Sequence, residues 1–206
     1  MSDEERHTKH LRVTDPSPWV ARFSGHVPQN GSVLDLACGG GRHTQVFLHS
    51  GHPVTAIDKN TDAICERLGD HENLEIVTAD LESGQHPFHE GGSLFKRTFD
   101  GIVVVNYLYR DHLGALINSL NPGGVLVYET FARGNEEYAR PRNPDHLLRA
   151  GELLELVQGR LQVVAYEHGL VETGDIPGVK QRLVAVNDLG QSAREEGEPP
   201  AHTIQV

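Results

Sequence analysis

The chain has few cysteines, no long apolar run and a shortage of positive charge. Cys38 and Cys65 are its two cysteines, too few for a disulfide framework, so we expect reduced thiols. No apolar stretch approaches the roughly 20 residues that a membrane-spanning helix needs. Residues 1–7 lack the cationic and then apolar order of a signal peptide. These absences predict a soluble, cytoplasmic protein with no membrane partner.

The charge balance and the histidine spacing exclude two further classes. The 18 Lys and Arg face 29 Asp and Glu, for a formal net charge of −11. Because phosphate backbones bind basic surfaces, this balance argues against nucleic acid as the partner. The 13 histidines contain no HxxxH or HxH pair, so we expect no metal site. A small-molecule substrate remains, and a monomer or a dimer is equally open.

The length and the local composition predict one domain with two extensions. Residues 1–14 are polar and are expected to be flexible. Residues 15–187 read as a single domain, which begins with a short helix after Pro18 that buries Trp19. Residues 188–206 are acidic and lack apolar periodicity, so we expect a disordered tail.

Strand-like and helical stretches alternate through the domain, which predicts an α/β fold with helices on both faces of a parallel sheet. Near the C-terminus two strands follow one another without a helix, which predicts an antiparallel hairpin at the edge. We therefore expect a Rossmann-like, doubly wound, seven-stranded sheet, mostly parallel with an antiparallel last strand. The predicted strands are 33–37, 53–58, 74–78, 101–105, 125–131, 161–168 and 179–186, with helices near 42–50, 61–68, 109–119 and 150–158.

Three consecutive glycines follow the first predicted strand. Glycine lets a turn bring backbone N–H groups close to a ligand, and the helix behind adds the positive end of its dipole. Asp35, in the strand, supplies an acceptor suited to a cationic group. A dinucleotide fingerprint needs another glycine where Thr44 stands, because that glycine allows close helix–strand packing. A nicotinamide-dependent oxidoreductase is therefore disfavoured.

Carboxylates also end the next two predicted strands. Asp58 follows the glycines by about 20 residues, the spacing of an acidic residue that accepts hydrogen bonds from ribose hydroxyls. Lys59 beside it is suited to lie over a purine face, or simply in solvent. Asp80 ends the third strand at the same sheet edge, where it is able to accept from an adenine amine.

Together these motifs resemble class I S-adenosylmethionine-dependent methyltransferases. The segment 35–41 is similar to the family's first motif, and 99–106 and 120–126 are similar to its fourth-strand motif and its Leu-x-Pro-Gly-Gly turn. The resemblance implies S-adenosylmethionine as cofactor, and within the family it is nearest to compact bacterial tellurite-resistance-like members. The cofactor-binding residues that it implies are Asp35, Ala37, Cys38, Gly39, Gly41, Asp58, Lys59, Asp80, Leu81, Asn106 and Tyr107, with the last two near the sulfonium.

The methyl acceptor is expected to bind over the ends of the fourth and fifth strands. The candidates there are Tyr107, Arg110, Arg133 and Tyr138, and no catalytic base is assigned. Arg140 belongs to the same arginine-rich segment, and these arginines suit either an anionic substrate or pairing with nearby glutamates. An Asn-Pro-Pro-Tyr motif is absent, which disfavours methylation of DNA adenine or protein glutamine. We expect methyl transfer to a small molecule; the alternative is a cofactor-binding sensor or partner protein without turnover.

Overall fold

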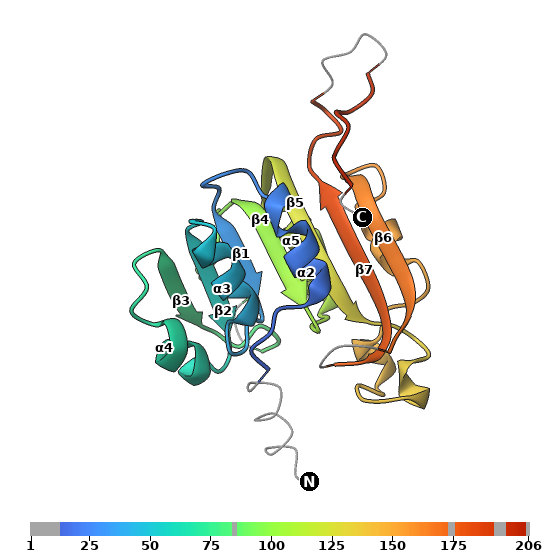
Figure 1. Ribbon diagram of the computed structural model, residues 1–206, viewed down its shortest axis with the longest axis horizontal. Helices are drawn as coiled ribbons and strands as arrows, with labels where there is room; N and C mark the ends of the chain where they lie inside the picture. Colours follow the sequence, from blue (N-terminus) through green and yellow to red (C-terminus); the bar gives the residue numbers. More distant parts are fainter. Residues whose placement is uncertain (1–12, 84–85, 173–175, 192–196, 205–206) are drawn as a thin grey trace.

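The computed structural model describes residues 13–83, 86–172, 176–191 and 197–204. It contains a seven-stranded sheet in the order β3-β2-β1-β4-β5-β7-β6, drawn from left to right in Figure 1. The strands are β1 (Val33–Leu36), β2 (Val54–Asp58), β3 (Leu74–Thr78), β4 (Phe99–Val105), β5 (Leu120–Phe131), β6 (Gln162–Val171) and β7 (Gly178–Val186). The α-helices are α2 (Pro18–Phe23), α3 (Arg42–His49), α4 (Asp62–Leu68), α5 (Arg110–Asn118) and α6 (Glu152–Val157).

The sheet confirms the predicted topology. Strands β1 to β5 are parallel, and β7 is antiparallel to both β5 and β6. The antiparallel hairpin predicted at the edge of the sheet is therefore present, with β7 paired to β5 and with β6 as the outermost strand. Pairing on both sides explains why β7 is almost entirely buried while β6 is largely exposed.

Alternation along the central strands separates two hydrophobic cores. Leu34, Ile102 and Leu126 face α5 and α6, where Leu116 and Leu153 pack against them. Their neighbours Val33, Val103 and Val125 face the other side and pack with Trp19 of α2 and Phe47 of α3. Figure 1 shows α2 and α3 in front of the sheet. Such double coverage is what continuous Val and Leu runs predict for parallel strands.

The strand ends and the segment that follows β5 meet at one edge of the molecule. The arrowheads of β1 and β4 point to the lower edge in Figure 1, and residues 132–151 lie at the same edge. This segment contains two short 3₁₀ turns, Asn135–Glu137 and Pro144–His146. Ligands of open α/β sheets bind at the carboxyl ends of the strands, so this edge is where a site is expected.

The two extensions are described only in part. Most of the N-terminal extension, residues 1–12, and residues 192–196 and 205–206 of the expected disordered tail lie outside the described residues. The described tail residues form no helix or strand, but His202 contacts Asp188 at 2.7 Å and the Thr203 carbonyl lies 2.9 Å from a ring nitrogen of His26. Within the described part of the chain no helix is long and apolar enough to cross a membrane.

Candidate functional site

A cavity of about 700 Å³ opens at the carboxyl edge of the sheet. This volume falls within the roughly 300–1,000 Å³ of small-molecule sites. The turns after β1, β2, β3 and β4 form one wall, and residues that follow β5 form the other. Of the residues expected to bind a cofactor, nine line the cavity: Ala37, Cys38, Gly39, Asp58, Lys59, Asp80, Leu81, Asn106 and Tyr107.

The turn after β1 has the left-handed backbone that the glycines predict. Ala37, Gly39 and Gly41 have φ values of 56°, 53° and 73°. Gly41 lies behind the cavity lining, at the start of α3. A Cβ atom on Gly41 would come within 2.7 Å of the Ile64 side chain. Gly41 therefore lets α4 pack against the turn and does not itself face the cavity.

Asp35 also lies behind the cavity lining. Its carboxylate is almost fully buried and accepts a 2.6 Å hydrogen bond from the Thr44 hydroxyl. Burial is the main reason that the pKa of Asp35 is raised to about 6, and the hydrogen bonds from Thr44 oppose that shift. Thr44, which the sequence presents as a missing glycine, thus has a positive role, because it ties α3 to β1.

Asp58 connects the end of β2 to the glycine turn. Its Oδ2 accepts from the Gly39 backbone N–H at 2.9 Å, and its Oδ1 accepts from the Asn60 N–H at 3.0 Å. Each carboxylate oxygen is able to accept more than one hydrogen bond. Asp58 is half-buried, so both oxygens retain capacity for a ligand while the backbone fixes their position.

Asp80 and Leu81 form the adjoining part of the wall, beyond β3. Asp80 is exposed and accepts from the Ser83 hydroxyl at 2.5 Å and from the Glu82 N–H at 3.0 Å. The Ser83 hydrogen bond is the largest cause of a lowered Asp80 pKa. Leu81 is buried, and its carbonyl contacts Nε2 of His112 in α5. The His112 contact fixes this turn against the helix.

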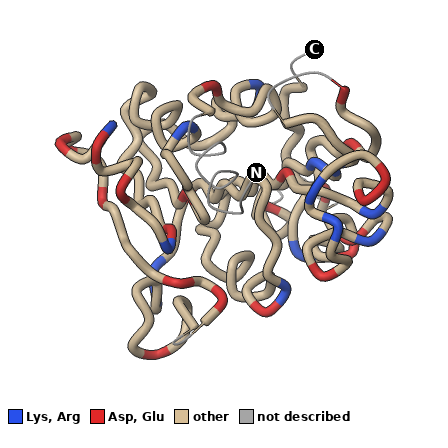
Figure 2. The backbone as a smooth tube through the Cα atoms, turned by 90° about the horizontal axis from the view of Figure 1, so that it is seen from below, with Lys and Arg blue, Asp and Glu red and all other residues tan. Residues whose placement is uncertain are grey.

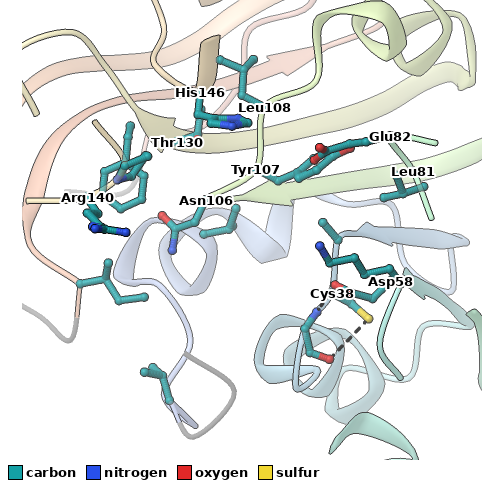
Figure 3. A pocket seen from close by; sticks show the side chains of 18 of the residues that line it. Cys38, Asp58, Leu81, Glu82, Asn106, Tyr107, Leu108, Thr130, Arg140 and His146 are labelled. Carbon is teal, nitrogen blue, oxygen red and sulfur yellow. Dashed lines mark hydrogen bonds between the residues drawn. The ribbon is translucent and has the colours of Figure 1, made fainter. Parts of the chain in front are cut away.

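Asn106 and Tyr107 follow β4 and occupy the middle of the cavity wall. The Asn106 side-chain oxygen and the Tyr107 hydroxyl are buried, and neither has a hydrogen-bond partner among the described residues. In Figure 3 Tyr107 extends toward Glu82, whereas Asn106 points toward Arg140. Burial, and then the charges of Glu82 and other groups, raise the pKa of Tyr107. Tyr107 therefore belongs to the carboxylate end of the cavity.

Cys38 lines the cavity as a thiol. Its Sγ lies 3.8 Å from the Gly39 carbonyl, and burial followed by the charges of Asp35 and Asp58 raises its pKa. A nucleophilic cysteine needs a lowered pKa. Cys38 is thus a small buried side chain in a tight turn.

The opposite wall comes from the end of β5 and the segment after it. Thr130, Phe131, Arg140, Arg142 and His146 contribute to the cavity lining. The sequence pointed to this segment as a whole, because long loops at a ligand edge are often functional. It did not single out Arg142 or His146, since their direction depends on an irregular path that no periodicity predicts.

Three of the four expected acceptor residues lie outside the cavity lining. Arg110 donates to both oxygens of Glu152 at 2.7 and 3.0 Å and to the carbonyls of residues 145 and 147. Arg133 lies 4.0 Å from Glu136, and Tyr138 is 60% exposed. These placements differ from the sequence expectation. Arg110 holds α5 to α6, and of the four candidates Tyr107 lines the cavity.

A series of buried polar side chains lies beneath His43 of the cavity lining, and no sequence motif indicated it. His43, which lines the cavity, accepts through Nε2 from the Ser17 N–H at 3.2 Å. The Ser17 hydroxyl donates to Glu129 at 2.5 Å, and Lys180 donates to the other Glu129 oxygen at 2.5 Å. Burial is the largest cause that lowers the pKa of His43, to about 3. His43 is therefore neutral at pH 7 and already engaged through one ring nitrogen.

Comparison with known proteins agrees with this geometry. The family model described as a methyltransferase domain matches residues 7–169. The chain belongs to this methyltransferase family. The match confirms the family expected from the strand-end motifs, and it includes the whole cavity wall formed by the turns after β1, β2, β3 and β4.

Curated relatives of this methyltransferase differ in what they act on. A mitochondrial ubiquinone biosynthesis O-methyltransferase of Schizosaccharomyces pombe is 33% identical over 106 residues, covering 49% of this chain and 38% of the relative. A tRNA U34 carboxymethyltransferase of Shewanella is 31% identical over 147 residues, covering 65% of this chain and 42% of the relative. The chain matches less than half the length of these relatives.

Solved structures show the same fold. TehB from Haemophilus influenzae superposes with a TM-score of 0.65 at 19% identity, covering 89% of this chain and 66% of TehB. The 1,6-didemethyltoxoflavin-N1-methyltransferase of Burkholderia thailandensis superposes with a TM-score of 0.58 at 20% identity, covering 90% and 81%. These similarities confirm the predicted methyltransferase fold.

Proposed function

We propose that this protein transfers a methyl group from S-adenosylmethionine to a small-molecule acceptor. The observation that carries the proposal is the continuity of the cavity. One wall bears the strand-end residues of a nucleoside-type site, and the other comes from the segment after β5. A second molecule therefore has room beside the first, which a cofactor-binding protein without turnover would not need.

The residues present fit the cofactor. Asp58 is held by two backbone N–H groups and has acceptor capacity left for two ribose hydroxyls. Asp80 and the Leu81 backbone lie where the edge of an adenine would reach them. Lys59, next to Asp58, lines the same part of the cavity. The buried, unpartnered polar atoms of Asn106 and Tyr107 are explained by a ligand, because buried polar groups normally have partners.

S-adenosylmethionine, when bound, supplies a methyl group on a sulfonium that is already activated. The acceptor's lone pair would form the new bond to the methyl carbon, and the electrons of the broken carbon–sulfur bond would remain on sulfur. The chain's task is then to position the acceptor and exclude water. Asn106 lies between the two walls in Figure 3, which suits it to orient the acceptor. A base is needed only for an acceptor that must lose a proton.

Incubation with methyl-labelled S-adenosylmethionine and a panel of thiols, amines, carboxylates and metalloid oxyanions tests this proposal. Label should appear in one class of small molecule. A protein that binds S-adenosylhomocysteine tightly but labels none of them would favour the sensor alternative. Labelling of RNA alone, the type of acceptor named for one curated relative, would contradict the small-molecule assignment.

A further inference from the structure

Among the described residues, the acidic side chains that line the cavity gather at one end. Asp58, Asp80 and Glu82 line the end formed by β2 and β3, where Lys59 also lies. Arg140, Arg142 and His146 line the opposite end, and no Asp or Glu among the described residues lines the cavity there. Figure 3 shows Glu82 and Arg140 on opposite sides of Asn106. In a chain with 29 acidic and 18 basic residues, this separation runs against the overall composition.

We propose that the acceptor is a small organic anion whose anionic group binds between Arg140 and Arg142. The inference rests on the proposed function, since it names the occupant of the wall opposite the cofactor residues. Guanidinium groups present paired N–H donors that match a carboxylate or another planar oxyanion. Arg140 points toward Asn106 (Figure 3), so an anion held there has its remaining atoms directed to the middle of the cavity.

A buried side chain fixes the segment that carries these arginines. Asn135 is fully buried and donates to the Pro141 carbonyl at 3.0 Å, directly between the two arginines. Its side-chain oxygen accepts from the Val179 N–H of β7 at 3.1 Å. A Cβ atom at Gly178 would lie 2.3 Å from that oxygen, so β7 approaches Asn135 closely. Asn135 is thus a positioning residue that holds the arginine-bearing turn against the sheet.

The size and the charge of the molecule favour a small anion over a nucleic acid. A volume of about 700 Å³ accommodates the cofactor and a compact partner. On the right-hand side of Figure 2 the basic residues are interleaved with acidic ones, without a continuous basic stripe. The net charge of −11 opposes a long phosphate backbone, which binds through many cations at once.

Calorimetric titration of benzoate and its neutral isostere benzamide into the S-adenosylhomocysteine-bound protein tests the inference. Benzoate should bind, and benzamide should bind at least roughly tenfold more weakly, because charge-assisted hydrogen bonds are lost. Arg142→Gln should weaken benzoate binding by a similar factor, and Arg142→Lys by less. Equal binding of the two probes, absent benzoate binding, or an unchanged Arg142→Gln variant would overturn the inference.

Two controls separate this inference from the proposed function. Arg160→Gln removes an arginine that bonds to Asn118 away from the cavity and should leave benzoate binding unchanged. S-adenosylhomocysteine should bind the Arg142→Gln variant as it binds the parent, and failure of the parent to bind it would contradict the proposed function itself. If a transfer RNA binds in place of benzoate and Arg142→Gln weakens that binding, the anion is a nucleic-acid phosphate and the small-anion inference fails.

Discussion

Among single residues, Asp35 shows what the sequence predicts and what only the structure reveals. The sequence places a carboxylate in a buried strand before the glycines, and that placement is seen. The contact with Thr44 does not follow from the glycine spacing, because a dinucleotide fingerprint has a closely packed glycine at that position. A hydroxyl at that position instead offsets part of the cost of burying a charge.

Asp35→Asn should make the folded protein more stable at neutral pH. Folding raises the pKa of Asp35 from 3.8 to about 6. Ionisation of Asp35 therefore costs no stability below about pH 4, and the folded protein loses stability as the pH rises from about 4 to about 6. At 1.36 kcal/mol per pKa unit, the loss is about 3 kcal/mol as an order of magnitude. Urea unfolding of both proteins between pH 4 and 8 measures it.

The advantage of Asp35→Asn should grow between pH 4 and 6 and then remain constant. Asp70→Asn, the same change at an exposed turn, is the matched control for removing one carboxylate. A stability difference for Asp35→Asn that does not vary with pH would show that Asp35 titrates in the folded protein as it does in the unfolded chain.

At the scale of elements, the regular parts of the chain were predictable and the irregular ones were not. All seven predicted strands overlap strands of the sheet. Continuous apolar runs indicate central strands such as β1 and β4, because burial on both faces demands them. The insertion of β7 between β5 and β6 depends on pairing between distant strands, which no local pattern encodes. The segment 132–151 has neither the apolar periodicity of a helix nor that of a strand. The sequence therefore indicates its arginines as a group but not the direction in which each side chain points.

Arg110→Leu should destabilise the fold while leaving cofactor affinity unchanged. Arg110 pairs with Glu152, whose side chain is 8% exposed. Burial acts to raise the pKa of Glu152, but hydrogen bonds from Arg110 and from the Arg149 backbone keep that pKa below its usual value. Loss of a buried pair costs about 3–5 kcal/mol, and because Arg110 itself is 38% exposed we expect about 1–3 kcal/mol.

Thermal or urea unfolding measures the cost, with Arg149→Leu as a matched control. Arg149 also contacts Glu152, at 3.5 Å, but is 69% exposed, so its replacement should cost less than about 1 kcal/mol. If Arg110→Leu keeps full stability and instead abolishes methyl transfer, Arg110 belongs to the acceptor site, and its assignment as a link between α5 and α6 is wrong.

In the molecule as a whole, the cavity combines a wall that the sequence predicts well with one that it predicts less well. The turns after β1 to β4 form a wall that strand-end carboxylates and glycines indicate in advance. The opposite wall folds back from the end of β5 and meets the first across Asn106 (Figure 3). This division explains why the sequence indicates a methyl donor more directly than a methyl acceptor.

Titration calorimetry with S-adenosylhomocysteine and with NAD shows whether the cavity binds the proposed methyl donor. We expect one S-adenosylhomocysteine per chain, no NAD binding, and an Asp58→Ala variant whose binding is weakened by about 2–3 kcal/mol through loss of charged hydrogen bonds. Asp62→Ala, at an exposed position of α4, should bind as the parent does. Binding of NAD in place of S-adenosylhomocysteine, or full affinity in a folded Asp58→Ala protein, would show that the residues at the strand ends do not hold S-adenosylmethionine.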